Sequence, residues 1–305
     1  MQIIRAAIQD FLELLAWPVL IAVVPWALGF RIARAISQRG WFYRDEAEAA
    51  LILTTQIVPQ QDHALWIERY CFTRIMDHAD LYISLLHGRR WVEREVRCHG
   101  RWPSQRPFVS LTFHWGNGLL ALRSLQYAVG PFAGVALAVD KSQFRGRPLR
   151  YAYVKLRNWE TGRAIGGGLS YTGSAARQFV AAIERGTSIC GLFDVPPLQN
   201  VKSAQVPFLG SVGTFPRGAA RLAARHNVPL VVFRSLVDPE SGRRELWIDS
   251  ILAGTSESVM IESSVHDLES AIQSQPAAWH MWMALPAFFT HPTVEVSIVA
   301  TPKKT

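Results

Sequence analysis

The sequence predicts an α/β fold with a mainly parallel central sheet flanked by helices, preceded by an apolar N-terminal membrane helix. Three features of the 305-residue chain support this prediction. Residues 14–30 contain no charged side chain, and residues 45–100 carry apolar side chains at the mixed three- and four-residue spacing of helices. From residue 107 onward, short apolar runs alternate with helical patterns, an order that is typical of a parallel sheet.

The apolar run at residues 14–30 (LLAWPVLIAVVPWALGF) lies at the lower limit for crossing a bilayer, which takes roughly 17–25 residues. Asp10 and Glu13 precede it and no small-residue cleavage motif follows, which disfavours a signal peptide. More arginines follow the run than precede it, so the positive-inside rule places the rest of the chain in the cytoplasm. We expect residues 1–35 to be a membrane anchor or embedded helix, with a helix docked on the protein body as the alternative. Residues 36–305 are expected to form one α/β domain.

Within that domain we expect residues 45–100 to be a helical subregion and residues 107–305 to be the α/β body. The expected elements of the body are a strand at 107–113, a helix at 117–129, a strand at 134–140, a helix at 173–186, a strand at 187–193, a helix at 215–227, and strands at 228–236 and 245–251. Ser174 is a suitable N-cap for the second of these helices and Gly186 suits the position after it. Pro216 suits the first turn of the third helix.

The composition indicates a membrane-associated protein with an anionic partner. Hydrophobic residues make up 49% of the chain, which is high for a soluble protein and low for one with many membrane spans. The formal net charge of +8 favours an acidic protein or an anionic lipid, although a solvated basic surface explains the same charge. No consecutive run of lysine and arginine resembles a nucleic-acid-binding tail, so we expect no nucleic acid partner.

The cysteines and histidines predict neither a disulfide framework nor a metal site. Cys71, Cys98 and Cys190 are far apart and lack Cys-x-x-Cys spacing. The nine histidines are dispersed, and no His-Glu-x-x-His motif occurs. We therefore expect no metal, no cofactor, and a reducing compartment for the folded body.

The stretch PFVSLTFHWGNGLLALRSL contains the main candidate for chemistry: a strand pattern, then His114, a glycine-containing turn and a helix. One interpretation is a dinucleotide-binding turn, because the pattern Gly-x-Gly-x-x-Ala begins at Gly116 and Asp140 ends the next strand 24 residues later. A second interpretation is a turn of purely structural importance, with a buried histidine.

A third interpretation makes His114 a catalytic base. A histidine at the carboxyl end of a strand, facing a helix N-terminus, lies where α/β proteins bind ligands. The positive end of the helix dipole keeps the ring neutral and able to accept a proton. The amide groups of Asn117 and Gly118 are then candidates for stabilising an oxyanion. A serine hydrolase is disfavoured, because no Gly-x-Ser-x-Gly motif occurs.

The stretch HWGNGLL resembles the His-x-Gly-Asn-Trp-(Glu/Asp) core of the lipid A late acyltransferases, within the lysophospholipid acyltransferase superfamily. Three further stretches resemble segments of that family in the same order. They are SAARQFVAAIERGTSICGLFDVPP, VPFLGSVGTFPRGAARLAARHNVPLVVFRSL and LESAIQSQPAAWHMWMALPAFF, the last with a Pro-x-x-Trp motif. The resemblance covers nearly the whole chain, including the apolar N-terminal helix and the helical region at residues 45–100.

The resemblance implies an enzyme that transfers an acyl chain from acyl carrier protein or coenzyme A to a hydroxyl of a lipid or glycolipid. The reaction would take place at the cytoplasmic face of a bacterial inner membrane. His114 would be the general base that deprotonates the acceptor hydroxyl, which then attacks the thioester directly. Asp194, in the stretch GLFDVPP, takes an acidic position of the family, with Val195 in place of the usual glutamine. The basic charge suits an acidic carrier protein.

The sequence departs from the family at position 119, where Leu119 replaces the acid that partners the histidine. A carboxylate there orients the imidazole and stabilises its charged form. Asp140, Glu160 and Asp194 are the candidates for supplying that carboxylate from elsewhere. If none of them does, the chain is instead a partner protein that binds acyl carrier protein or lipid and has lost the reaction.

Several arginines follow the strand expected at 134–140 and are candidates for binding an anionic head group or a phosphopantetheine phosphate. They are Arg145, Arg147, Arg150, Arg157 and Arg163. Arg163 lies in a segment that resembles the substrate side of the family, so we assign it to substrate binding together with Asn117 and Gly118.

Overall fold

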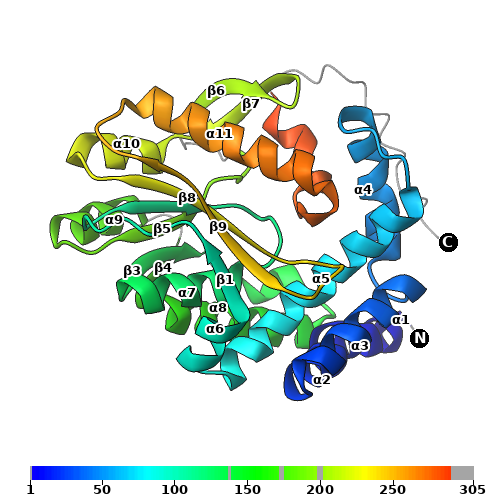
Figure 1. The fold of residues 1–305 in the computed structure, drawn as a ribbon. Coiled ribbons are helices and arrows are strands. Elements are labelled where there is room, and N and C mark those ends of the chain that lie inside the picture. Colours follow the sequence, from blue (N-terminus) through cyan, green and yellow to red (C-terminus); the bar gives the residue numbers. More distant parts are fainter. Residues whose placement is uncertain (1, 137–138, 172–174, 198–201, 290–305) are drawn as a thin grey trace.

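A twisted seven-stranded sheet forms the middle layer of the computed structural model, which describes residues 2–136, 139–171, 175–197 and 202–289. Its strands are β1 (Val96–His99), β2 (Val109–Thr112), β3 (Phe132–Ala136), β4 (Gly166–Tyr171), β5 (Ile189–Leu192), β8 (Leu230–Val237) and β9 (Arg244–Leu252). They lie in the order β1-β9-β8-β2-β5-β3-β4, and among the described strands of this sheet only β8 and β9 pair antiparallel (Figure 1). The predicted α/β class and mainly parallel sheet are therefore confirmed.

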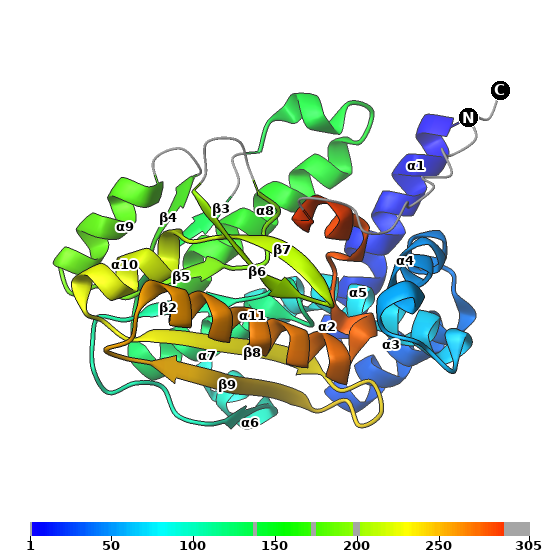
Figure 2. The same cartoon turned by 90° about the horizontal axis from the view of Figure 1, so that it is seen from above.

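Helices flank this sheet on both faces. They are α1 (Gln2–Phe11), α2 (Trp17–Val23), α3 (Trp26–Arg39), α4 (Arg44–Ile57), α5 (His63–Leu86), α6 (Arg89–Glu95), α7 (Gly118–Val129), α8 (Pro148–Ile165), α9 (Ala175–Glu184), α10 (Gly218–His226) and α11 (Glu257–Ser274), with a π-helical turn η1 (Leu12–Ala16) and 3₁₀ segments η2 (Lys141–Phe144), η3 (Pro276–Ala278) and η4 (Trp282–Phe288). Helices α9, α10 and α11 lie on one face with the hairpin β6 (Ser203–Phe208) and β7 (Ser211–Pro216), whereas α6, α7 and α8 lie on the other (Figures 1 and 2).

The central strands are buried on both faces, because successive side chains point to opposite sides of a strand. In β8, Leu230 and Val232 pack in the core under α10 and α11. Val231 and Phe233 pack instead in the core that contains Leu125 of α7. Both sides of the central strands are therefore covered.

Most of the expected elements are confirmed, with ends shifted by a few residues. The helix expected at 117–129 is α7, and the four strands expected at 107–113, 187–193, 228–236 and 245–251 are β2, β5, β8 and β9. The strand expected at 134–140 is β3, which ends at Ala136. Gly186 adopts a positive φ of 76° just after α9, as expected, whereas the expected cap Ser174 lies outside the described residues.

The prediction differs from the structure in four places. Pro216 does not begin a helix: it ends β7, and α10 starts two residues later. Strand β1 occurs at the end of the region that was expected to be helical, and the hairpin β6–β7 was not expected. Helix α8 and strand β4 fill a stretch in which no element was expected.

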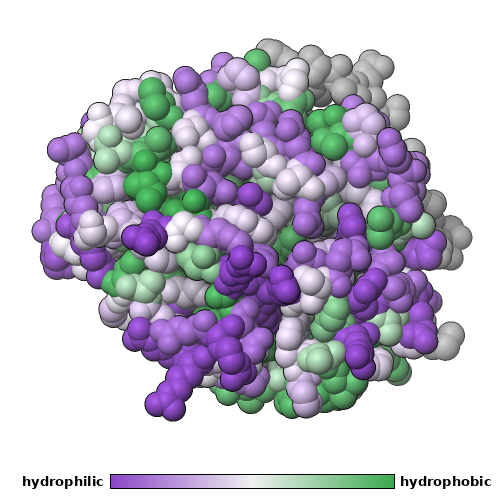
Figure 3. Space-filling view, viewed as in Figure 1, coloured by the Kyte–Doolittle hydropathy of each residue, from purple (hydrophilic) through white to green (hydrophobic). Residues whose placement is uncertain are grey.

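The N-terminal helices pack against the rest of the fold. A continuous helical segment runs through α1, η1 and α2, and α3 follows after a break at Pro25. Leu14 and Ile21 share a core with Phe72 of α5 and Leu120 of α7. By length and composition the stretch Ile4–Val23 could cross a membrane, a test that core helices and signal sequences also pass. Apolar side chains are visible at the lower edge of the surface, where α2 lies (Figure 3).

Candidate active site

Two neighbouring strands bring His114 and Asp194 together. β2 and β5 are parallel, and Thr112 pairs with Leu192 at their carboxyl ends. His114 and Asp194 each lie two residues beyond this pair, so equal distances past the strand ends place them side by side. The sheet register therefore fixes the relative position of the imidazole and the carboxylate.

The Asp194 carboxylate is fully buried and accepts hydrogen bonds from three N–H groups. His114 Nδ1 lies 3.0 Å from Oδ1, and the backbone N–H of His114 lies 2.9 Å from both carboxylate oxygens. The indole Nε1 of Trp279 donates to Oδ2 at 2.8 Å. The Asp194 carboxylate can only accept a hydrogen bond, so His114 Nδ1 carries the imidazole proton and donates it. Nε2 is then the basic nitrogen of the ring.

The basic nitrogen of His114 is accessible. The side chain is 35% exposed, and no hydrogen bond occupies Nε2 among the residues that the structure describes. Burial alone would lower the pKa of His114, but the adjacent Asp194 carboxylate and its hydrogen bonds raise the pKa above its ordinary value. The arrangement is an oriented general base with one face open.

Leu119 occupies the position where the acid was expected, and it is part of the apolar core. Its side chain is 3% exposed and packs in the cluster that contains Ile75 and Met76 of α5. A carboxylate in that environment would lie among aliphatic groups. Asp194, one of the three acids expected to replace it, supplies the carboxylate that contacts His114.

The glycine turn after β2 is shaped by β8. Gly116 has a φ of 65°, and a Cβ atom placed on it would lie 2.0 Å from the carbonyl oxygen of Ser235. Its backbone N–H donates to Ala278, so this residue is enclosed by backbone on both sides. This geometry disfavours the dinucleotide interpretation, because no phosphate can approach a glycine whose open side faces a neighbouring strand.

Asn117 fastens the same turn to β8 from its other end. It is buried, its backbone N–H donates to Ser235, and its Oδ1 accepts from the N–H of Val237. The backbone N–H of Asn117 is therefore engaged and is not free to stabilise an oxyanion as expected. Gly118 differs, because a Cβ atom on it would meet nothing within 4 Å and its amide begins α7.

A second histidine, His280, lies beside His114 and was not identified from the sequence. Its backbone N–H donates to the carbonyl of His114, and its Nε2 lies 2.8 Å from the carbonyl oxygen of Gly116. Arg74 of α5 approaches its Nδ1 at 3.4 Å. Burial lowers the pKa of His280 to about 4, so this ring is neutral near pH 7 and acts as a fixed brace for the turn.

An ion pair between α5 and α8 lies next to these histidines. Arg157 Nη2 lies 2.7 Å from the Asp77 carboxylate, and the Asp77 charge contributes to the raised pKa of His114. Burial would raise the pKa of Asp77, but the Arg157 guanidinium holds it below its ordinary range. Arg157 was among the arginines proposed for anion binding, whereas Asp77 and Arg74 were missed because a single acid or arginine in a helical pattern gives no signal.

Trp279 was contained in the Pro-x-x-Trp motif without an assigned role. The motif begins at Pro276, and the isolated bridge between Trp115 and Trp279 fixes this segment against the turn after β2. Trp279 is fully buried, and its indole N–H donates a hydrogen bond to the Asp194 carboxylate. Sequence analysis could have identified it as a buried donor only with Asp194 already placed.

The structure does not bring Arg163 or Glu160 to His114. Both lie on the last turns of α8, directly before β4 begins, whereas His114 follows the end of β2. β2 and β4 run in the same direction. Residues that precede β4 therefore lie at the amino ends of the strands, whereas His114 lies at their carboxyl ends. Glu160 is fully buried and pairs with Arg123 and Arg163.

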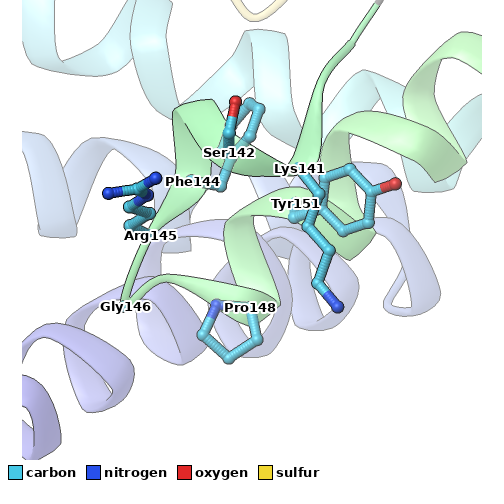
Figure 4. A pocket seen from close by; sticks show the side chains of 7 residues that line it. All are labelled: Lys141, Ser142, Phe144, Arg145, Gly146, Pro148 and Tyr151. Atoms are coloured by element: carbon cyan, nitrogen blue, oxygen red, sulfur yellow. The ribbon is translucent and has the colours of Figure 1, made fainter.

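Asp140 lies at the carboxyl ends of the strands, as His114 does, but it has another role. It is exposed, its carboxylate accepts from the N–H of Ser142, and this hydrogen bond caps η2 and holds the pKa of Asp140 below its ordinary value. A hollow of about 380 Å³ adjoins it, lined by residues of η2 and the start of α8. Figure 4 shows Lys141 and Arg145 on opposite sides of this turn, so their charges do not converge on one point.

Within the described ranges, no group of three or more histidine, cysteine, aspartate or glutamate side chains could hold a metal ion. Searches against protein-family models and against curated proteins give no match for this chain.

Proposed function

We propose that this protein is an acyltransferase of the lysophospholipid acyltransferase type. It transfers an acyl chain from an acyl carrier protein or coenzyme A thioester to a hydroxyl of a lipid or glycolipid. The observation that carries this proposal is the buried Asp194 carboxylate 3.0 Å from His114 Nδ1, combined with the open Nε2 of the same ring. It supplies the acid that the family's histidine requires and that position 119 lacks.

In the proposed reaction, His114 Nε2 accepts the proton of the acceptor hydroxyl as its oxygen attacks the thioester carbonyl carbon. The carbonyl becomes an oxyanion, for which the backbone N–H of Gly118 in the first turn of α7 is the candidate donor. When the tetrahedral intermediate collapses, the C–S bond breaks and the thiolate takes the proton from the imidazolium. Asp194 stays ionised and stabilises the imidazolium in between.

The net charge and the apolar N-terminal segment of the chain support a lipid reaction at a membrane. The chain has a net charge of +8, which suits an acidic carrier protein, and its N-terminal helical segment is apolar. The proposed location is the cytoplasmic face of a bacterial inner membrane. No metal and no cofactor take part in the proposed mechanism.

The proposal is tested by incubating the purified protein with labelled acyl carrier protein thioesters and a membrane lipid extract. Wild type should transfer label into lipid, His114→Ala should not, and the exposed-histidine control His266→Ala should behave as wild type. Mass spectrometry of the labelled lipid would identify the acceptor.

Equal background transfer by wild type and His114→Ala, with carrier protein still bound, would refute acyl transfer and support the alternative. In that alternative the protein is a catalytically altered partner that binds acyl carrier protein or lipid. If neither carrier nor lipid binds, the family resemblance itself is an unsound guide.

A further inference from the structure

Exposed apolar side chains are concentrated at the N-terminus of the chain. Of the 18 large hydrophobic side chains that are exposed among the described residues, eight belong to the first 41 residues. Six of these lie on α1, η1 and α2 and are here named the apolar stripe: Ile4, Ile8, Phe11, Leu15, Leu20 and Val23. Such a concentration marks an interaction surface rather than the scattered exposure of a normal protein surface.

The π-helical turn η1 keeps the apolar stripe on one face. Ile4, Ile8, Phe11 and Leu15 follow each other at spacings of four, three and four residues, which align on an α-helix. The step from Leu15 to Leu20 is five residues, which in an α-helix would rotate the side chain by about 140°. Here the N–H of Trp17 donates to the carbonyl of Leu12, five residues earlier, so the wider turn restores the alignment.

The opposite face of the same segment is fastened to the protein body by charged groups. Asp10 is 1% exposed and Glu13 5%, which is unusual for carboxylates on an apolar helix. Arg147 of α8 binds the Asp10 carboxylate through two nitrogens, at 2.6 and 2.9 Å. Arg150 lies 3.0 Å from Asp10 and 3.4 Å from Glu13. In addition, the Tyr82 hydroxyl donates to the carbonyl of Leu14 within η1.

Three positively charged side chains without ion-pair partners among the described residues lie on α1 and shortly before α8. Arg5 on α1 is exposed, as are Lys141 and Arg145, which precede the arginine that binds Asp10. None of the three forms an ion pair among the residues that the structure describes. In Figure 2, α1 and the start of α8 project from the same side of the molecule.

We propose that the N-terminal segment is an interfacial helix that lies along an anionic bilayer, with the apolar stripe dipped into the lipid and the protein body held on its other face. Six apolar side chains over a 20-residue helix give a stripe about 30 Å long, which is as long as a helix that crosses a bilayer. A crossing helix, however, would have to release two buried carboxylates from their arginines and expose them to hydrocarbon.

Lipid is the occupant that the charges favour. Arg5 lies on α1 itself, and Lys141 and Arg145 lie in and directly after η2, just before α8. Arginine and lysine near an anionic leaflet add to the binding of an amphipathic helix. The proposal refines the membrane part of the proposed function and is independent of acyl transfer, since its tests measure vesicle binding and topology.

The first test is sedimentation of the full-length protein with phosphatidylcholine vesicles, with and without phosphatidylglycerol. We expect binding that is stronger with phosphatidylglycerol and weaker in high salt. The double variant Ile8→Asp/Phe11→Asp should bind at least about tenfold more weakly, because two apolar anchors are replaced by anions. The matched control Val259→Asp, at an exposed apolar position on α11, should bind as wild type.

The second test distinguishes a lying from a crossing helix. Arg5→Cys, in a Cys98→Ser background, is reconstituted on sealed vesicles with the body outside and treated with a membrane-impermeant maleimide. Labelling before detergent is expected, because an interfacial helix keeps residue 5 on the same side as the body.

Three outcomes would overturn the proposal. The first is labelling of the introduced cysteine only after detergent, which would show a crossing helix. The second is vesicle binding that is unchanged in the double variant or equal on both lipid compositions. The third is a wild-type dimer that dissociates in the double variant while vesicle binding persists, which would make the stripe a protein interface. Circular dichroism of each variant ensures that a loss of binding is not a loss of folding.

Discussion

Replacing Asp194 by asparagine should isolate the contribution of the carboxylate to the site. The change keeps the size of the side chain but turns one acceptor oxygen into an NH₂ donor. Three N–H groups, two from His114 and one from Trp279, now donate to the carboxylate. The remaining oxygen cannot accept all three, so at least one buried donor loses its acceptor, at a cost of about 1–3 kcal/mol in the free energy of unfolding.

The same change should alter the imidazole. If the asparagine NH₂ group faces Nδ1, that nitrogen must become an acceptor and the proton moves to Nε2, which then cannot deprotonate a hydroxyl. The corresponding substitution in the serine protease triad lowers turnover by about 10⁴, and we expect a loss of about 10³–10⁴ in acyl transfer here. The pKa of His114 should fall, because the carboxylate that raises it is gone.

Two-bond ¹H–¹⁵N spectra of the histidine rings report both the tautomer and the pKa without reference to any reaction. Asp140→Asn is the matched control, since it makes the same chemical change at an exposed acid that also follows the carboxyl end of a strand. An Asp194 variant that kept the His114 proton on Nδ1, titrated as wild type does and transferred acyl groups within a few-fold of the wild-type rate would contradict the orienting role of the carboxylate.

Three further predictions concern the support of this pair. Trp279→Phe removes one hydrogen bond to a buried carboxylate and should lower the free energy of unfolding by about 1.5–3 kcal/mol in urea titrations; an unchanged midpoint would contradict the role given to the indole. Gly116→Ala should cost about 2–6 kcal/mol, because its Cβ would collide with a backbone oxygen at a positive φ, whereas Gly118→Ala should be nearly neutral; equal stabilities would count against this account of the turn. Because the folded-state pKa of His114 is raised, its pairing with Asp194 should add stability below a pH of about 6.5 that is lost as the pH rises through the folded-state value, and urea unfolding from pH 5 to 9 should show this loss in wild type but not in Asp194→Asn.

The sheet was predictable because its signal is local. Apolar runs of four to eight residues separated by helical patterns define β2, β5 and β8 before any contact is known. Strand β4 was missed because its first three residues are glycines, which carry no apolar side chain to reveal it. Strand β1 was missed because it continues a helical pattern and its side chains are at most half-buried.

The candidate site was only partly predictable, for a physical reason. His114 and Asp194 could be named from their places after two strands, but their contact depends on the register of β2 with β5, which no sequence pattern records. Arg163 was assigned to substrate binding from its neighbourhood in the sequence. In the structure it lies at the end of α8, at the opposite end of the strands from His114. His280 and Asp77 come from distant segments, and only the folded chain brings them beside His114.

The origin of the carboxylate explains how position 119 can be a leucine. An acid at that position would lie on the first turn of α7, where its reach to the imidazole depends on helix geometry. An acid after β5 depends instead on the hydrogen-bonded register of two central strands, since Thr112 pairs with Leu192 two residues before each side chain. With the carboxylate supplied in this way, the first turn of α7 can be apolar, and Leu119 packs against α5 in the same core that receives the N-terminal helices. The same apolar surface on α5 and α7 thus accommodates both Leu119 and the N-terminal helices.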